Sequence, residues 1–395
     1  MTDRTASAAD FQGFGTSAYR SYVLAVLFIV YTFNFIDRTV LTIVQEPIRH
    51  EFGLSDTQLG LLGGPTFAFF YTFLGIPIAR FAERRNRMTI LSVCLALWSG
   101  MTALCGAASS FTMLLLARVG VGVGEAGCTP TANSVIGDYF APEKRSTAVA
   151  IYSMGVPIGA SIAAIGGGFL AEHLNWRESF LVLGLPGLAL AILAKLTVRE
   201  PPRSTPDTEA TGVLEAFGAL ARKPTFWNIA LGGAMASFTG YGVGQFTNSF
   251  FIRSHHLSIL DASLISGVLV GIFGGGGTFL AGWMSDKVVG RHPNALAWFP
   301  GLTLLISIPL SIGGYLAHSL LLAVPLLALA TLFQYPYVSA IYAATQAVVH
   351  PRMRATAVAV LLFIVNIIGL GAGPPAIGAL SDFLAGHHLA AAGLS

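Results

Sequence analysis

Four charged residues lie deep inside long apolar stretches of this sequence. Asp37 and Arg38 stand in "NFIDRTVL" (34–41), and Arg118 and Glu125 stand in "RVGVGVGEAGCTP" (118–130). A carboxylate in a low-dielectric site beside a cation can bind or release a proton when water reaches it, because burial and pairing act on its proton affinity in opposite directions. These residue types are therefore suited to proton transfer or to binding an anionic group.

Three glycines of the second stretch also spell G-x-G-x-x-G, the pattern of a dinucleotide-binding loop. Such a loop follows a strand and opens a helix, whereas here "SFTMLLLA" leads in and the chain stays apolar for many residues afterwards. This context favours one continuous helix. One face of that helix would carry a cation, a carboxylate and two small residues: Arg118, Glu125, Gly122 and Thr129. We therefore reject a nucleotide site.

The composition indicates an integral membrane protein. Hydrophobic residues make up 54% of the 395 residues, charged residues only 10%, and the mean hydropathy is +0.70, whereas soluble domains carry about 25% charged residues. The net charge of +3 gives no indication of nucleic-acid binding. The three cysteines lie singly in apolar blocks, so we expect buried free thiols. Neither a nucleophile–base pair nor a metal-binding pattern is present, so we expect no enzyme activity, no cofactor and no metal site.

Long apolar blocks predict an all-helical membrane fold, because about 20 apolar residues cross a bilayer as a helix. The predicted spans are 21–44, 57–80, 88–109, 112–138, 145–170 and 178–197, then 226–251, 262–285, 294–316, 319–348 and 354–381. A hydrophilic segment rich in Pro and Thr separates the two sets. The predicted units are a six-span half at 1–197, a linker at 198–224 and a second half at 225–395.

Lysine and arginine counts in the short loops predict the orientation. Most of these residues fall on the side that holds the N-terminus and the linker. The other side receives only Arg49, Arg177 and Arg253. We therefore expect the N-terminus and the linker on the cytoplasmic side of the inner (plasma) membrane, with lipids as neighbours.

Two short motifs recur in the two halves. "PEKRSTAVA" (142–150) resembles "PRMRATAVA" (351–359), and "ARFAERRNR" (79–87) resembles "GWMSDKVVGR" (282–291). Paired motifs at similar separations indicate two homologous halves, as in transporters built from parallel repeats.

These motifs resemble those of the major facilitator superfamily. The loop at 79–87 matches its G-x-x-x-D-R-x-G-R signature with departures at Ala79, Glu83 and Asn86, and "RVGVGVGEA" resembles its fourth-span motif. "NFIDRTVL", "GEAGCTPTANSVIGDYF" and "GAGPPAIGALSD" resemble the spinster branch. The resemblance implies two pseudo-symmetric six-helix halves that rock about a central cavity. The family has twelve spans, whereas eleven are predicted here up to Ser395. We expect the native chain to continue into a twelfth helix, and the alternative is that a disordered last span was left out of the sequence.

The intramembrane charges suggest a hypothesis for how proton binding is coupled to transport. Asp37 would be the principal proton site, Glu125 its partner, and Arg38 either a counter-ion or the contact for an anionic substrate group, with Arg118 nearby. Static ion pairs that hold helices together are the alternative. The second half has no charge inside its spans and offers amide and aromatic groups. Candidates to line the cavity are Asn34, Thr129, Tyr241, Gln245, Asn248, Tyr335, Tyr342 and Asn366.

The resemblance also implies a charge network at the cytoplasmic helix ends that stabilises one transport state. Its candidates are Arg80, Glu83, Arg84, Asp138, Arg145, Asp286, Lys287 and Arg354, although the positive-inside rule by itself explains most of the bases. Candidate helix hinges are Gly155, Pro157, Gly159, Gly373 and Pro374.

The resulting functional prediction is a monomeric, proton-coupled secondary transporter of an amphipathic lipid-like or hydrophobic anion. A proton/drug antiporter, a small organic anion transporter of the same superfamily, and a non-transporting receptor or scaffold are the alternatives.

Overall fold

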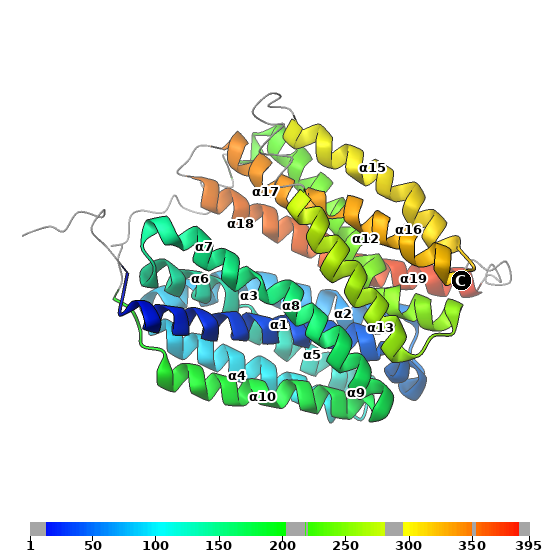
Figure 1. Cartoon of the computed structure of the whole chain (residues 1–395), viewed down its shortest axis with the longest axis horizontal. Helices are drawn as coiled ribbons and strands as arrows, with labels where there is room; N and C mark the ends of the chain where they lie inside the picture. Colours follow the sequence, from blue (N-terminus) through cyan, green and yellow to red (C-terminus); the bar gives the residue numbers. More distant parts are fainter. Residues whose placement is uncertain (1–12, 203–217, 219, 281–294, 350–352, 387–395) are drawn as a thin grey trace, which may run out of the picture.

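The computed structural model describes residues 13–202, 218, 220–280, 295–349 and 353–386, and their regular structure is helical throughout (Figure 1). The first set of helices comprises α1 (Ser17–Phe52), α2 (Asp56–Gly63), α3 (Pro65–Arg84), α4 (Arg87–Gly106), α5 (Phe111–Glu125), α6 (Cys128–Tyr139), α7 (Pro142–Ser153), α8 (Gly155–Ile162), η2 (Ala163–Gly167), α9 (Gly168–His173) and α10 (Trp176–Thr197). The second set comprises α12 (Pro224–His255), α13 (Ile259–Val268), η3 (Leu269–Gly274), α15 (Ala295–Leu316), α16 (Leu320–Gln334), α17 (Pro336–Val348), α18 (Arg354–Val365), η5 (Asn366–Ala372) and α19 (Gly373–Gly386).

The helices correspond to the predicted spans. Within the described residues, ten helical stretches are long and apolar enough to cross a membrane. The predicted span at 226–251 is α12, a helix of 32 residues that is not one of these ten. Gln245 and Asn248 are among the polar residues that lower its hydropathy, and both are buried.

Several spans are interrupted helices. Pro65 and Pro336 stand in the first turn of α3 and α17, where the missing N–H leaves no intrahelical hydrogen bond unmade. The fifth, eighth and eleventh spans contain the π-helical turns η2, η3 and η5. Such turns are often found at functional sites, since they change the direction in which side chains point.

Helix α1 is longer than its predicted span, which ended at residue 44. The polar run that follows suggested a loop, but α1 continues to Phe52. Gln45 donates a hydrogen bond to the carbonyl of Gln245 at 2.7 Å, and Glu46 pairs with Arg253 at 2.6 Å. Both partners lie on α12, so tertiary contacts stabilise the polar end of α1.

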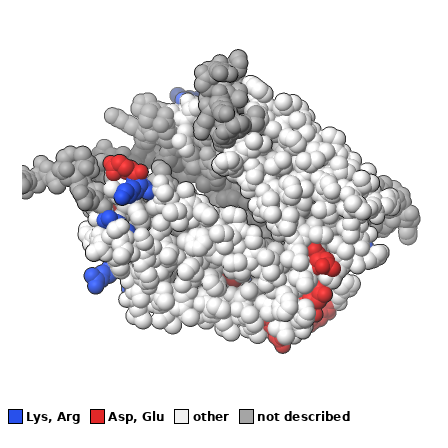
Figure 2. All heavy atoms as spheres, in the orientation of Figure 1, with Lys and Arg blue, Asp and Glu red and all other residues white. Residues whose placement is uncertain are grey.

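The helices form two bundles, α1–α10 and α12–α19, that lie side by side (Figure 1). Each has its own apolar core, with Trp98 and Phe180 fully buried in the first and Phe226 and Phe251 in the second. On the face in Figure 2, charged side chains gather at the two ends and leave a mostly uncharged band between them. This pattern suits a chain that crosses a bilayer.

Glycines allow close helix contacts at several crossings. The G-x-G-x-x-G stretch is helical up to Glu125, but the predicted continuous helix is interrupted, because a turn at Ala126 and Gly127 separates α5 from α6. A Cβ atom at Gly122 would lie 3.0 Å from the carbonyl oxygen of Phe67, and one at Gly124 would lie 2.7 Å from the backbone nitrogen of Trp98. At Gly159, predicted as a hinge, it would lie 2.4 Å from the carbonyl oxygen of Thr32. These glycines bring α3, α4 and α1 into backbone contact with their neighbours.

Replacing Gly159 with alanine is expected to lower stability by about 1–3 kcal/mol, because the added methyl group would meet the rigid backbone of α1. Thermal unfolding of the purified protein in detergent measures this loss. Gly166→Ala is the matched control, since nothing lies within 4 Å of a Cβ atom there. Equal melting temperatures for the two variants would contradict the prediction.

Candidate functional site

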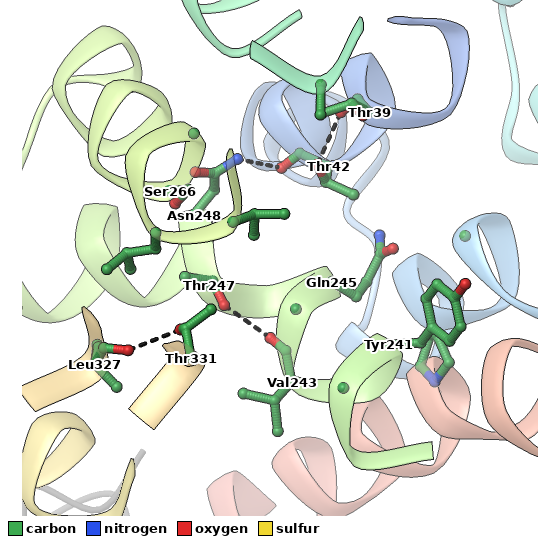
Figure 3. Close-up of a pocket in the computed structure, with 18 of the residues that line it drawn as sticks. Thr39, Thr42, Tyr241, Val243, Gln245, Thr247, Asn248, Ser266, Leu327 and Thr331 are labelled. Atoms are coloured by element: carbon green, nitrogen blue, oxygen red, sulfur yellow. Dashed lines mark hydrogen bonds between the residues drawn. The ribbon is translucent and has the colours of Figure 1, made fainter. Parts of the chain in front are cut away.

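A cavity of about 600 Å³ lies between the two bundles. Residues of α1, α3 and α5 contribute one wall, and residues of α12, α13, α15 and α16 contribute the other. Figure 3 shows part of this cavity, with α1 on one side and α12 and α16 on the other. The cavity is the place where both bundles can contact one bound molecule.

Two arginines of the first bundle line the cavity, Arg38 and Arg118. The Nε atom of Arg38 donates to Oε2 of Glu125 at 2.6 Å. The Arg38 guanidinium lies over the rings of Phe67 and Tyr71, 4.6 and 4.7 Å from their centroids. These cation–π contacts and the ion pair orient Arg38, whose side chain is 21% exposed and reaches the cavity.

The carboxylate of Asp37 lies behind this wall and is fully buried. Arg118 donates to the backbone carbonyl of Asp37 at 3.4 Å, not to its carboxylate. Trp98 and Thr102 face the carboxylate, yet within the described chain no donor reaches hydrogen-bonding geometry with either oxygen. Asp37 is thus a buried acid whose hydrogen-bonding capacity is unused in this conformation.

The four predicted coupling residues therefore form one cluster on α1 and α5. Arg38 pairs with Glu125, while Glu125 and Arg118 are charged groups that interact electrostatically with Asp37. The two arginines face the cavity and the two acids lie behind them.

Four of the eight predicted cavity residues line the cavity: Tyr241, Gln245, Asn248 and Tyr335. The other four do not. Asn34 is completely buried beside Glu125. Thr129 lies near the hydroxyls of Tyr31 and Tyr152, Tyr342 lies beside Tyr241 and Tyr71, and Asn366 is the first residue of η5. Sequence alone could not distinguish these positions, because helix rotation decides which polar residue faces the cavity.

Three threonine hydroxyls along the cavity wall are turned back to their own helices. Thr42 donates to the carbonyl of Thr39, Thr247 to that of Val243, and Thr331 to that of Leu327 (Figure 3). A hydroxyl satisfied by its own helix leaves its methyl group free for packing. The wall therefore offers a more apolar surface than its residue types suggest.

A second charged cluster joins the two bundles at the end opposite the linker, and the sequence analysis did not assign it a role. We call it the closed-end network: Glu46, Arg49, Asp56, Arg253, Ser381 and Asp382. Arg253 of α12 donates to both oxygens of Asp56 at 2.8 Å and to Glu46 at 2.6 and 3.0 Å. Ser381 of α19 donates to Asp56 at 2.7 Å. The available signal in the sequence was that this side of the predicted topology holds few basic residues, two of which, Arg49 and Arg253, belong to the network.

The backbones of α2 and α19 touch beside this network. Asp382 accepts hydrogen bonds from the amides of Asp56 and Thr57, both at 2.9 Å, and so caps the start of α2. Cβ atoms at Gly60 and Gly378 would lie 2.4 and 2.2 Å from carbonyl oxygens of the opposite helix. The two bundles are therefore closed against each other at this end.

At the linker end, Arg87 is the centre of the charge cluster. It is buried and pairs with Asp138 and with Glu200 of the linker. Among the other predicted residues of this network, Arg145 donates to the Phe140 carbonyl at 3.0 Å, and Arg80 and Arg84 are exposed. Asp286 and Lys287, and the side chains of Glu83 and Arg354, lie outside the described residues.

The predicted hinges lie at helix junctions and crossings. Gly155 begins α8, Pro157 follows in its first turn, and Gly373 begins α19. A Cβ atom at Gly373 would lie 2.5 Å from the carbonyl oxygen of Phe238, and Pro374 contacts Gly60 across the bundles. Close packing is visible at these positions, and bending stays a prediction.

Comparison with known proteins places this architecture in a family. The family model of the Major Facilitator Superfamily matches residues 27–374. The chain belongs to this superfamily. It is therefore a multi-pass membrane transporter and not an enzyme.

Individual relatives refine the comparison. The chain is 35% identical to an MFS-type efflux pump of Mycolicibacterium smegmatis, over 91% of this chain and 84% of that protein. It is 26% identical to a hexuronate transporter of Bacillus subtilis, over 94% and 91%. The crystal structure of a bacterial homolog to the human lysosomal transporter spinster, in an inward-facing and unoccupied conformation, is 43% identical, with a TM-score of 0.88 and coverage of 96% of this chain and 86% of that one. The resemblance to the spinster branch is thus confirmed.

Proposed function

We propose that this superfamily transporter moves an amphipathic, lipid-like or hydrophobic anion by proton-coupled alternating access. The observation that carries the proposal is the cavity between the bundles, with Arg38 and Arg118 on one wall and methyl-bearing side chains on the other. An anionic headgroup would bind the arginines, and an apolar tail would pack against the opposite wall.

The arginine wall suits an anion for two reasons. Only the Nε atom of Arg38 is committed to Glu125, so the rest of its guanidinium group is available to a carboxylate, sulfate or phosphate group. The Nε atom of Arg118 is buried and has no hydrogen-bond partner among the described residues. An anion that binds both arginines would compete with Glu125 for Arg38.

This competition links substrate to protons. Glu125 and Asp37 are fully buried, and a buried carboxylate that loses its cation or gains water changes its affinity for a proton. Substrate binding and proton binding would thereby depend on one another, as thermodynamic coupling requires. Asp37 is our principal proton site, because its oxygens bind no cation among the residues that the structure describes.

The closed-end network supports alternating access. Ion pairs between bundles that break when the bundles rock apart stabilise one state over the other. With the linker on the cytoplasmic side of the inner membrane, as the positive-inside rule predicts, this conformation is inward-facing. The bacterial spinster homolog crystallised in a conformation of that description.

A small, polar organic anion is the second candidate. The hexuronate transporter among the relatives and the two cavity arginines favour it. A sugar acid, however, needs many hydrogen-bonding groups, and the threonine hydroxyls described above are already satisfied by their own helices. This observation ranks the amphipathic anion first.

A flux assay tests the proposal. Purified protein in liposomes is presented with alkyl phosphates, alkyl carboxylates, hexuronate and a lipophilic drug cation, with and without an imposed pH gradient. We expect flux of the alkyl anions and a response to the gradient. Arg38→Gln should reduce this flux about 10- to 100-fold, because one charged hydrogen bond contributes about 1.5–3 kcal/mol.

Three outcomes would overturn the proposal. Hexuronate flux in the absence of alkyl-anion flux would establish the small-anion transporter, and drug-cation flux would establish the antiporter. Binding of alkyl anions without any flux would indicate a receptor. Lys195→Gln is the control for loss of a cation outside the cavity, since Lys195 is exposed on α10, and its flux should equal that of the wild type.

A further inference from the structure

Asn248 on α12 carries a buried hydrogen-bond acceptor that no group in the described part of the chain uses. The residue is 6% exposed and lines the cavity. Its Nδ2 atom donates to the carbonyl of Thr42 at 3.2 Å (Figure 3). This bond fixes the orientation of the amide, so Oδ1 is the atom left over, and it has no partner among the described residues.

The hydroxyl group of Ser266 is a second polar group of the cavity that lacks a hydrogen-bond partner within the described chain. Ser266 on α13 also lines the cavity, and its buried Oγ atom likewise makes no hydrogen bond within the described chain. Other cavity hydroxyls, such as those of Thr247 and Thr331, are satisfied by their own helices. Buried polar atoms normally find partners, so two unpaired atoms on one cavity wall indicate a place where a bound molecule supplies the partner.

The position of Asn248 relative to Arg38 follows from α1. Thr42, the partner of Asn248, is four residues after Arg38 on the same helix face, and both line the cavity. Four residues of an α-helix advance about 6 Å. Asn248 therefore lies about one helical turn further toward the closed end than the arginine that would hold the anionic group.

We propose that Asn248 is a specificity-determining residue, whose Oδ1 atom accepts a hydrogen bond from a hydroxyl or ammonium group located about one helical turn from the anionic group of the substrate. Ser266 assists as a second hydrogen-bonding group. The preferred substrate is then an anion with a donor near its headgroup, not a plain alkyl anion. This inference rests on the proposed function, because it requires an anion at Arg38.

The unpaired acceptor makes the preference directional. A ligand hydroxyl or ammonium group that donates to Oδ1 replaces a bond otherwise missing in the buried site, whereas a methyl ether at that place cannot donate and leaves the oxygen unpaired. A ligand with no substituent at that position makes no hydrogen bond to Oδ1. The site should therefore distinguish a donor from an acceptor of nearly the same size.

Three probes test this with the full chain in lipid nanodiscs: decanoate, 5-hydroxydecanoate and 5-methoxydecanoate. Binding is measured by titration calorimetry, with empty nanodiscs subtracted. We expect the hydroxy acid to bind about three- to tenfold more tightly than either other probe, the effect of one neutral hydrogen bond. Asn248→Ala should abolish this preference. Asn228→Ala, at an exposed position of α12 outside the cavity, should keep it.

The outcomes separate the two proposals. Equal binding of all three probes to the wild type overturns the role of Asn248 but agrees with the proposed function, and this comparison needs no variant to fold. A preference that survives in Asn248→Ala overturns the assignment to this residue. Failure of all three probes to bind the wild type contradicts the amphipathic-anion function itself.

Discussion

Replacing Asp37 with asparagine is expected to abolish the response of transport to a pH gradient. One coupled proton and a pH difference of one unit change the equilibrium accumulation of substrate about tenfold. The wild type should show this factor, and the variant should accumulate substrate equally with and without the gradient. The physical reason is that asparagine keeps the shape of the buried side chain but cannot bind the proton.

The surroundings of Asp37 make it the decisive position. Its carboxylate is faced by Glu125 and Arg118 on α5 and by Trp98 and Thr102 on α4, and Cys105 lies nearby. Within the described residues Asp37 forms no ion pair, whereas Glu125 is committed to Arg38. A change in water access should therefore alter proton binding at Asp37 before it alters that at Glu125.

The measurement is substrate accumulation in proteoliposomes, combined with substrate exchange at equal pH. Exchange should persist in Asp37→Asn, because it requires alternation but no net proton movement. Asp261→Asn is the matched control, since Asp261 is exposed in the first turn of α13. A full pH response in Asp37→Asn would show that the proton binds elsewhere.

Replacing Arg253 with alanine is expected to shift the conformational equilibrium away from the closed-end state. The change removes four close nitrogen–oxygen contacts of the closed-end network. It leaves Arg49 as the cation beside the carboxylates of Glu46 and Asp56, at 3.9 and 3.5 Å. Loss of one partner from a buried ion pair costs about 3–5 kcal/mol. Because the Arg253 side chain is 30% exposed, solvent screening reduces this to about 1–3 kcal/mol.

Such an energy corresponds to a shift of about 5- to 150-fold between the two states. Spin labels at His50 and His318, which are exposed in the two bundles near this end, should report longer distances in Arg253→Ala. Arg177→Ala is the matched control, because the Arg177–Glu51 pair at 2.5 Å lies at the same end but within the first bundle. Unchanged label distances in Arg253→Ala would show that the network does not stabilise the closed end.

The sequence predicted more of the fold than of the contacts between side chains of different helices. Span positions, the helical character of the glycine-rich stretch and the family all follow from local features, such as hydropathy over about 20 residues and short motifs. Helix α1 was predicted too short, because its polar end is stabilised by residues about 200 positions away. Half of the predicted cavity residues face elsewhere, because periodicity identifies a helix face but not what that face contacts.

What the sequence determined by itself was which groups are available inside the membrane, since the bilayer excludes charge unless a functional or structural partner compensates for it. Asp37, Arg38, Arg118 and Glu125 could be named on that basis. Only the tertiary structure decided that Arg38 pairs with Glu125, that Asp37 has no ion-pair partner in the described chain, and that Arg253 joins the two bundles. The reason is geometric: an ion pair depends on the rotation and crossing of packed helices, and these are set by contacts between residues far apart in the chain.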